Sequence, residues 1–409
     1  TCFAMTKRLL IVGGGPAGCA AALKAAQAGL EVTLYERGDL GGVCLHAGCI
    51  PAKALLQAQP DLDWQALTGQ IREKISLLAS GMARRLHRAG VTVRRAWAQL
   101  DALPESDYYL LALGKPPRPL PQVPGKTLYT PASILHLDAL PREIAICGGG
   151  VTGVEYAQIF AAQGCRVCLY EQQPEILPGF YGSDLLAERC EALGISLCCG
   201  AAFRLDALPQ KAIFMATGSG LLMQSTGAAL KKIGVEAGPG GIRIDSEGRT
   251  SRPGVFAAGD CSDSMATAYE ASATARRAVD VMLGRPVKPR GVSLAVVCGA
   301  YDLVNVGASD GLAVEVPLQY NGYAFLHDRM DGAVRLVCDP ASGILTGAQL
   351  FFPGAAEIAY FLAAIVDAGL PVNALAGALC FHPTYAETLQ EAAEKLYDLL
   401  RDSQHGPAH

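Results

Sequence analysis

The stretch KRLLIVGGGPAG, residues 7–18, decides the fold. Its apolar half predicts a buried strand, its glycines predict a tight turn, and the Ala-rich run that continues to Ala28 predicts a helix. A second apolar strand is expected from Glu31 to Tyr35, and it leads into Glu36, 18 residues after Gly18. This pattern is typical of a βαβ unit that binds a dinucleotide. Backbone N–H groups at the helix N-terminus face the pyrophosphate, and the acid accepts hydrogen bonds from a ribose.

The same pattern occurs a second time. A strand is expected at residues 143–147, the turn is GGGVTG at residues 148–153, a helix is expected at 154–163, and a strand at 166–170 leads into Glu171. Glu171 follows the last glycine, Gly153, by the same 18 residues. One glycine pattern is weak evidence because such turns also arise for geometric reasons, but two copies with matched acids predict two dinucleotide sites. The carboxylate of Glu171 repels a 2′-phosphate, which favours NAD(H) over NADP(H).

The rest of the chain fits one plan. Three apolar runs that close on glycine, at residues 109–114, 212–218 and 255–260, are expected to be further strands of the nucleotide-binding units. A helix is expected at 266–283, and residues 284–291 are expected to form a linker. Beyond it, strand-like runs at 294–297 and 334–337 and helical patterns at 355–368 and 385–400 predict a separate α+β domain.

Composition excludes several classes of protein. At 409 residues the chain can form two or three domains, and only 18% of its residues are charged, so much of the surface is expected to be buried between domains or subunits. The net charge of −4 is small and the basic residues are scattered, which argues against nucleic-acid binding. No apolar run is long enough to cross a membrane, and the N-terminus lacks the layout of a signal peptide, with Met5 as a candidate natural start. The 14 cysteines lack the dense spacing of a secreted scaffold, so a cytoplasmic location is expected.

Two cysteines, Cys44 and Cys49, lie in the segment GGVCLHAGCIPAK at residues 41–53. Their spacing is not typical of a zinc site, and no second Cys or His pair follows at a suitable distance, so metal binding is the weaker interpretation. Two structural buried thiols are a second possibility. The flanking glycines and the position directly after a nucleotide-binding unit favour a redox disulfide, although spacing alone leaves all three roles open.

This segment resembles the pyridine nucleotide-disulfide oxidoreductases, in which it reads GG-T-C-L-x-x-G-C-I-P-S-K-x-L. Val43 here replaces Thr and Ala52 replaces Ser. The resemblance covers nearly the whole chain and includes FHPTYAE at residues 381–387, which is similar to the family's H-P-T-x-x-E. Within the family the chain is most similar to the dihydrolipoamide dehydrogenases. The resemblance implies an FAD-binding domain at 1–140 and 252–285, an NAD-binding domain at 141–251, and a dimerisation domain at 290–409 in a homodimer.

The resemblance also implies which residues hold the cofactors. The ADP half of FAD would lie against the first glycine turn, its ribityl chain would bind Asp260, and NAD(H) would lie against the second turn. Lys53 would lie near the flavin ring and pair with Glu155, because a buried lysine needs a partner. The residues expected to contact FAD are Gly13, Gly15, Pro16, Ala17, Gly18, Glu36, Gly42, Val43, Lys53, Gly114, Gly259 and Asp260. Those expected to contact NAD(H) are Gly148, Gly150, Gly153, Glu171 and Gly218.

The catalytic residues are implied in the same way. Cys49 would be the thiol next to the flavin, and Cys44 would exchange with substrate through a mixed disulfide. Electrons would then pass to the flavin and to NAD⁺ as a hydride. His382 would be the base that takes the substrate proton, oriented by Glu387, and would serve the cysteines of the other subunit. His46, between the two cysteines, is not expected to be the base.

Two features depart from the family. The chain is short, because the connections after Ala96 and Gly200 reach the next strand quickly, so meander strands are expected to be trimmed in both nucleotide domains. The run at residues 297–302 also differs from the family's F-T-x-P-E, which leaves the substrate open. Three functions stay in view: a dihydrolipoyl dehydrogenase acting on a lipoyl-bearing partner protein, an NADH-dependent reductase of another small or protein disulfide, and a flavin-binding regulatory protein without turnover. A mercuric reductase is disfavoured, because the C-terminus carries no cysteine pair.

Overall fold

The structure is a computed structural model that describes residues 6–58, 63–115, 117–220, 222–263, 267–288 and 291–405, with the backbone alone at 222–225 and 404–405. Met5, Ala266 and the linker residues 289–290 lie outside these ranges. The chain forms two compact units. Unit 1 comprises residues 1–122, 130–139 and 218–290, and unit 2 comprises residues 123–129, 140–217 and 291–409.

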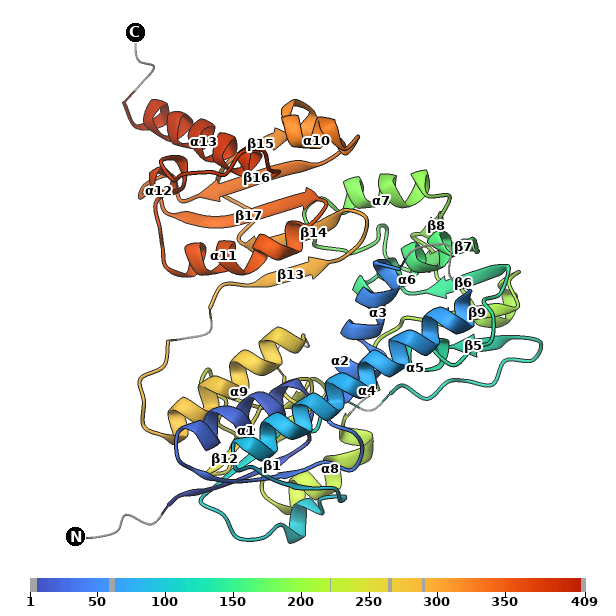
Figure 1. Ribbon diagram of the computed structural model, residues 1–409, viewed down its shortest axis with the longest axis vertical. Coiled ribbons are helices and arrows are strands. Elements are labelled where there is room, and N and C mark those ends of the chain that lie inside the picture. Colours follow the sequence, from blue (N-terminus) through green and yellow to red (C-terminus); the bar gives the residue numbers. More distant parts are fainter. Residues whose placement is uncertain are drawn as a thin grey trace. The chain divides into compact units, whose positions relative to one another are not determined.

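Unit 1 is built on a parallel sheet with the strand order β12-β4-β1-β2-β3. Figure 1 labels β12 and β1 of this sheet. Its strands are β1 (Arg8–Val12), β2 (Glu31–Tyr35), β3 (Thr92–Arg94), β4 (Tyr108–Leu111) and β12 (Val255–Ala257), with a small hairpin of β10 (Ala237–Gly238) and β11 (Gly241–Ile242). Its helices are α1 (Pro16–Gln27), α2 (Gly42–Ala47), α3 (Cys49–Leu56), α4 (Trp64–Arg88), α5 (Pro131–Ile134), α8 (Leu222–Lys232) and α9 (Ala268–Met282), with the 3₁₀ turn η1 (Leu100–Ala102).

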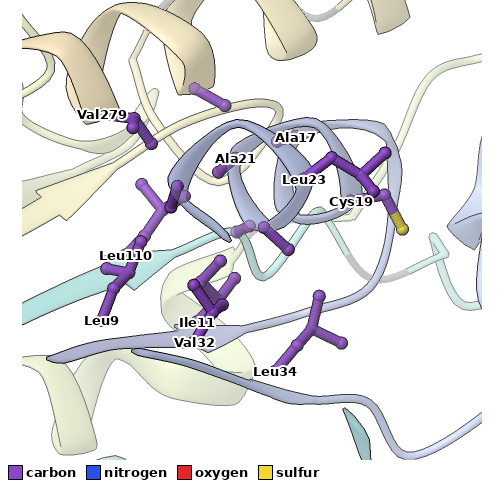
Figure 2. Packing of buried hydrophobic residues seen from close by; sticks show 14 of the residues in the cluster. Leu9, Ile11, Ala17, Cys19, Ala21, Leu23, Val32, Leu34, Leu110 and Val279 are labelled. Carbon is purple, nitrogen blue, oxygen red and sulfur yellow. The ribbon is translucent and has the colours of Figure 1, made fainter. Parts of the chain in front are cut away.

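The core of unit 1 fixes the position of the first glycine turn. Leu9 and Ile11 of β1 and Leu34 of β2 are at most 1% exposed, and Figure 2 shows them packed beneath α1. Each such buried side chain contributes about 1.5–3 kcal/mol. On its other side α1 packs against α9, and small residues such as Ala21 let the elements approach closely. The turn between β1 and α1 is therefore held between a rigid strand and a rigid helix.

The first part of unit 2 repeats this plan in a parallel sheet with the order β5-β9-β6-β7-β8. The predicted helix at 154–163 in fact begins at Val151, because Gly150 is its N-cap. The elements are β5 (Thr127–Tyr129), β6 (Glu143–Cys147), α6 (Val151–Ala162), β7 (Arg166–Glu171), α7 (Ser183–Ala192), β8 (Ser196–Cys199), the 3₁₀ turn η2 (Leu205–Ala207) and β9 (Ala212–Met215).

The second part of unit 2 is an antiparallel sheet covered by helices, with the strand order β13-β14-β17-β16-β15. Helix α11 packs on β14 and β17, and α13 packs on β15 and β16. The elements are β13 (Leu294–Val297), β14 (Asp302–Gly307), β15 (Leu312–Pro317), η3 (Leu318–Tyr320), α10 (Gly322–Leu326), β16 (Ala333–Cys338), β17 (Leu345–Phe352), α11 (Ala355–Asp367), α12 (Val372–Ala376) and α13 (Glu387–His405).

The predicted fold class, two Rossmann-like units followed by an α+β domain, is confirmed. One boundary differs: residues 218–251, expected with the NAD-binding domain, pack in unit 1, where α8 lies against η1 and Ile242 N donates to Cys261 O at 2.7 Å. Short 3₁₀ turns, η1 and η2, stand in the two connections where meander strands were expected to be trimmed. None of the helices in the described ranges is both long and apolar enough to cross a membrane.

Candidate active site

The first glycine turn is built by close backbone contacts. Gly13 adopts φ +106°, and a Cβ atom placed on it would lie 2.1 Å from Ala112 O. A Cβ on Gly18 would lie 1.8 Å from Gly13 O, so α1 can start against the turn only because this position lacks a side chain. The carboxylate of Glu36 then closes the turn, accepting a hydrogen bond from Gly14 N at 2.7 Å.

The second glycine turn repeats these contacts residue by residue. Gly148 adopts φ +109°, and a Cβ on it would lie 2.6 Å from Ala216 O. A Cβ on Gly153 would lie 1.8 Å from Gly148 O, the same distance as at Gly18. The carboxylate of Glu171 accepts from Gly149 N at 2.6 Å and from Gln173 N at 2.8 Å. The two predicted turns therefore share one geometry, although the two residues before the last glycine differ, Pro-Ala in the first turn and Val-Thr in the second.

The middle glycines of both turns leave room for a ligand. Gly15 is the N-cap of α1 and Gly150 is the N-cap of α6, and neither helix has a side chain that caps its N-terminus. A Cβ on Gly15 would meet nothing closer than 3.9 Å, and one on Gly150 would meet nothing within 4 Å. Open N–H donors at the positive end of a helix dipole are what a pyrophosphate requires. Both turns thus fit dinucleotides, with Pro16 at the first position of α1 and Ala17 buried behind it.

The other residues expected around FAD lie at the carboxyl ends of unit 1 strands. Gly114 follows β4 with φ +66°, and Gly259 follows β12 with φ +80°. Burial raises the pKa of Asp260, while the charge of Lys115 opposes that shift, so a cation lies near this carboxylate. In parallel sheets such strand ends bind ligands. Gly218, expected beside NAD(H), also has a positive φ, +83°.

The two cysteines lie where two short helices meet. Cys44 belongs to α2 and Cys49 is the first residue of α3, an arrangement that the sequence did not predict. A Cβ on Gly48 would lie 3.1 Å from Val43 O and 3.3 Å from the Cα of Cys44, so Gly48 lets the helices approach. Val43 is itself 63% exposed.

The thiols interact with each other. The hydrogen bond with Cys49, and then burial, raise the pKa of the Cys44 thiol, while the charge of Lys53 acts to lower it. The two thiols therefore lie within hydrogen-bonding reach of each other. Cys49 also lies at a helix N-terminus, where the dipole favours a thiolate.

Tyr269, near the start of α9, is a residue that sequence reasoning missed. Burial raises its pKa, and among the smaller influences the charge of Lys53 lowers it and Cys49 raises it, so the phenol lies near both. No motif indicates that Tyr269 lies near Lys53 and Cys49, because it is more than 200 positions from both in the chain. Nε2 of His46 lies 3.0 Å from Leu40 O, and this contact anchors the imidazole ring to the backbone.

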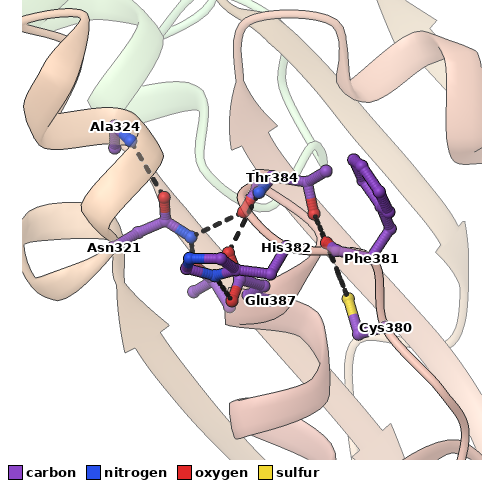
Figure 3. A network of polar contacts seen from close by, with 8 residues as sticks. Asn321, Ala324, Cys380, Phe381, His382, Thr384 and Glu387 are labelled. Carbon is purple, nitrogen blue, oxygen red and sulfur yellow. Dashed lines mark hydrogen bonds and ion pairs between the residues drawn. The ribbon is translucent and has the colours of Figure 1, made fainter.

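The predicted base and its partner form a direct contact in unit 2. Nδ1 of His382 lies 2.8 Å from Oε1 of Glu387, and the imidazole is 79% exposed (Figure 3). The second carboxylate oxygen of Glu387 accepts from Thr384 N at 3.0 Å. His382 and then the Thr384 amide hold the pKa of Glu387 below its ordinary value. The carboxylate thus orients the ring while Nε2 can reach another molecule.

Asn321 anchors this loop from the other side, as Figure 3 also shows. Its Nδ2 donates to Thr384 O at 2.9 Å and to Oγ1 of Thr388 at 3.0 Å, and its Oδ1 accepts from Ala324 N at 2.9 Å. The side chain is 8% exposed. These three hydrogen bonds tie Asn321 to the loop at Thr384 and to the starts of α10 and α13, and sequence reasoning missed it because an isolated Asn carries no pattern.

Glu155 anchors the segment that departs from the family pattern. It is 3% exposed, and its carboxylate accepts from Cys298 N at 3.0 Å. Gln158, one turn further along α6, donates to Cys298 O at 3.4 Å, and a Cβ on Gly299 would lie 2.2 Å from Oε1 of Gln158. The side-chain amide of Gln158 thus fills the space beside Gly299. The expected pair of Lys53 with Glu155 involves both units and stays a prediction.

Family comparisons agree with this geometry. The model of the family described as pyridine nucleotide-disulphide oxidoreductase matches residues 7–275, and the model of its dimerisation domain matches residues 310–393. Dihydrolipoyl dehydrogenase from Chlorobaculum tepidum is 30% identical over 447 residues, which cover 94% of this chain and 95% of the relative. The enzyme of that name from Pseudomonas aeruginosa is 28% identical, with 94% and 96% covered.

Solved structures share the fold. LpdA from Mycobacterium tuberculosis matches with a TM-score of 0.86 at 24% identity, covering 96% of this chain and 100% of that chain. The flavoprotein disulfide reductase RclA from Escherichia coli, in its Cu(II) complex, matches with a TM-score of 0.84 at 23% identity, covering 96% and 99%. Together with the two dinucleotide turns, the family match leads to one conclusion. The chain belongs to the pyridine nucleotide-disulfide oxidoreductase family, and as an enzyme of that class it uses FAD and NAD(H).

Proposed function

We propose that the protein is a dithiol:NAD⁺ oxidoreductase of the dihydrolipoyl dehydrogenase type, which oxidises a dihydrolipoyl group through Cys44 and Cys49. The observation that carries the proposal is the contact between these two thiols, from neighbouring helices, with the pKa of Cys44 raised by its hydrogen bond to Cys49. A disulfide between them accepts two electrons and releases two thiols, which matches the two-electron oxidation of a dithiol.

Each cysteine has its own task. A substrate thiolate attacks the Cys44 sulfur, the Cys44–Cys49 bond breaks, and Cys49 leaves as a thiolate that the N-terminus of α3 stabilises. The second substrate thiolate then attacks the substrate sulfur bound to Cys44, which closes the substrate disulfide and releases Cys44. Lys53, one turn after Cys49 on α3, adds a positive charge to this site.

His382 is the proposed base. Only thiolates attack disulfides, so a group must remove the substrate proton near neutral pH. The carboxylate of Glu387 accepts a hydrogen bond from Nδ1 of His382, which leaves Nε2 as the nitrogen that takes the proton. The imidazole is exposed, so a substrate can reach it. Glu387 also stabilises the imidazolium that forms.

The cofactors complete the electron path. When bound, FAD would supply two-electron transfer between a dithiol and NAD⁺. The turn of Gly13 and Gly18 would hold FAD and the turn of Gly148 and Gly153 would hold NAD(H), because their open helix N-termini suit pyrophosphates. Glu171, with both oxygens held by backbone amides, would repel a 2′-phosphate and so select NAD(H).

A homodimer is part of the proposal. The segment matched by the dimerisation-domain model exposes large apolar side chains, with Leu379 fully exposed, Phe381 79% exposed, and Tyr360 and Phe361 of α11 at 73% and 62%. Aromatic residues this exposed on one domain are typical of a subunit interface. Leu379 and Phe381 adjoin His382, so an interface formed there would bring the base to a second subunit.

The test is an assay of NADH formation from dihydrolipoamide and NAD⁺. The wild type and Cys199→Ser should both be active, because Cys199 lies outside the proposed site, while Cys44→Ser should lose activity. NADH oxidation with another disulfide, but little with lipoamide, would assign the protein to a different disulfide substrate. A purified yellow protein whose flavin NADH cannot reduce would refute turnover altogether.

A further inference from the structure

A second pair of thiols lies outside the site described above. Sγ of Cys168 on β7 lies 3.4 Å from Sγ of Cys198 on β8. Cys198 is exposed and Cys168 is partly exposed, so an oxidant in solution can reach them. Neither residue belongs to the cysteine motif or to the dinucleotide turns. The pair therefore has no part in the proposed reaction.

The sheet explains why the two sulfurs meet. Cys168 is paired in register with Ser196, and Tyr170 with Cys198, so the two cysteines are diagonal neighbours that face the same side of the sheet. The alternate positions Val167 and Leu169 of β7 are buried on the opposite side. Because side chains alternate along a strand, Cys199 points away from Cys168.

The short connection after β8 leaves this face partly uncovered. The 3₁₀ turn η2 is the regular element of this connection, which runs from Gly200 to Lys211. The ring centroids of Phe203 and Tyr170 lie 5.6 Å apart, and Tyr170 OH donates a hydrogen bond to Oε1 of Gln210 at 3.2 Å. Those contacts shield the sheet as far as β7, while Cys198 on the edge strand stays open to solvent.

We propose that Cys168 and Cys198 form a second, reversible disulfide when the protein meets a peroxide. The Cys198 thiolate attacks hydrogen peroxide and breaks its O–O bond, which gives a sulfenic acid, and the leaving hydroxide takes up the proton released by the thiol to form one water. The Cys168 thiolate then attacks the sulfenic sulfur, and the hydroxide that leaves takes up the second thiol proton to form a second water. In total, two thiols and one hydrogen peroxide give one disulfide and two waters. The inference does not depend on the proposed function.

The strands set the properties of this bond. The sulfurs must approach by about 1.4 Å to reach a disulfide length of about 2.05 Å. β7 and β8 pair in parallel, and with strands about 4.8 Å apart and a rise of about 3.3 Å per residue, diagonal Cα atoms lie roughly 8 Å apart, beyond the usual span of a disulfide. β8 must therefore move, and it can do so because it has four residues and lies beside β7 at the edge of the sheet that the described residues form. A strained bond of this kind is readily reduced by dithiols.

The Cys168–Cys198 pair lies next to the strand end that carries Glu171, the acid of the second glycine turn. β7 continues from Cys168 into Glu171, and Gly200, directly after β8, donates its N–H to Glu171 O at 3.1 Å. Cys198 is exposed and Cys168 only partly so, and burial raises the pKa of Cys168 to about 11, so Cys198 is the thiol that meets the oxidant first. The disulfide would tie the strand that carries the acid of the second turn to its edge neighbour.

The test is peptide mapping of the full-length holoenzyme after treatment with hydrogen peroxide and alkylation of the remaining thiols. Trypsin cuts after Arg166, Arg189 and Arg204, so Cys168 is the only cysteine of its peptide, 167–189, and Cys198 lies in peptide 190–204. We expect the two peptides to be linked, with a mass two hydrogens below their sum, and to separate after dithiothreitol.

Two variants make the assignment specific. Cys198→Ser should abolish the linked peptide, whereas Cys199→Ser, a change at the adjacent residue on the other side of the strand, should retain it. Circular dichroism and flavin content check that both variants fold. Linkage that persists in Cys198→Ser, or oxidation of Cys198 to a sulfinic acid in the wild type without any link to Cys168, would overturn the proposal.

Discussion

Nδ1 of His382 lies 2.8 Å from Oε1 of Glu387, and this contact fixes which nitrogen of the ring can act. A carboxylate accepts only from a protonated nitrogen, so the neutral imidazole carries its proton at Nδ1 and its lone pair at Nε2. Thr384 N holds the other carboxylate oxygen, so Glu387 cannot rotate away without losing a second hydrogen bond. The arrangement is that of a base oriented by an acid.

Replacing His382 should remove the base and spare the fold. We expect His382→Ala to lower kcat/KM for dihydrolipoamide by about 10²–10⁴-fold, the usual contribution of a general base. Because the imidazole is 79% exposed, flavin content and Tm should stay close to the wild type. Steady-state kinetics measure the effect, and full activity of the variant would refute His382 as the base.

Glu387→Gln should have a smaller effect, with a characteristic pH dependence. Loss of a charge-assisted hydrogen bond costs about 1.5–3 kcal/mol, or roughly tenfold to a hundredfold in kcat/KM. The pKa of Glu387 is lowered from its ordinary value of 4.5, so its stabilising contribution is present above that pH and is lost as the pH falls through the lower, folded-state value. The Tm difference between wild type and variant should therefore shrink on acidification. A difference that grows in acid would contradict the assignment.

Cys49→Ala should make Cys44 more acidic. The hydrogen bond with Cys49 is the main cause of the raised pKa of Cys44, so its removal should lower that pKa while Lys53 still acts in the same direction. At a fixed pH near 8, iodoacetamide should then alkylate Cys44 at least about tenfold faster than in the reduced wild type, the effect of one pKa unit. Mass spectrometry of the peptide spanning residues 38–53 follows the reaction. Slower alkylation would show that the two thiols do not interact in this way.

Gly153→Ala should disrupt the second nucleotide turn. The added Cβ would lie 1.8 Å from Gly148 O, a backbone atom that can move only if the turn opens. We expect the Kd for NADH to rise by about tenfold or more, equivalent to about 1.4 kcal/mol, with flavin content unchanged. Gly69→Ala in α4 is the control, because a Cβ there meets nothing within 4 Å and should leave binding unaltered. Equal NADH affinity in the two variants would count against the turn as the binding site.

The fold could be predicted from the sequence wherever a pattern is local. The strand, glycine turn and helix at residues 8–27 follow from apolar periodicity and from glycine positions that tolerate no side chain, as the contact of Gly18 with Gly13 O explains. The start of α6 was predicted three residues late, because the whole of GGGVTG was assigned to the turn although the helix already begins at Val151. Strand β17 was not predicted, because its sequence LTGAQLFF, with Thr346, Gly347 and Gln349, is neither a continuous apolar run nor a strict alternation.

The candidate site was predictable only in part. His382 and Glu387 stand within one motif, so their contact follows from a short spacing. Tyr269 and Asn321 reach their sites through tertiary packing, which leaves no trace in local sequence. The same holds for Gln158, whose hydrogen bond to Cys298 O joins positions 140 residues apart.

The most direct test of the central claim is an anaerobic titration of the oxidised, FAD-containing protein with dihydrolipoamide, followed by visible absorbance. If Cys44 and Cys49 form the redox disulfide with Cys49 beside the flavin, two-electron reduction should produce a long-wavelength thiolate-to-flavin absorbance, and Cys49→Ala should not produce it. If the wild type fails to develop that absorbance, or if Cys49→Ala develops it equally, the proposed role of this cysteine pair is contradicted.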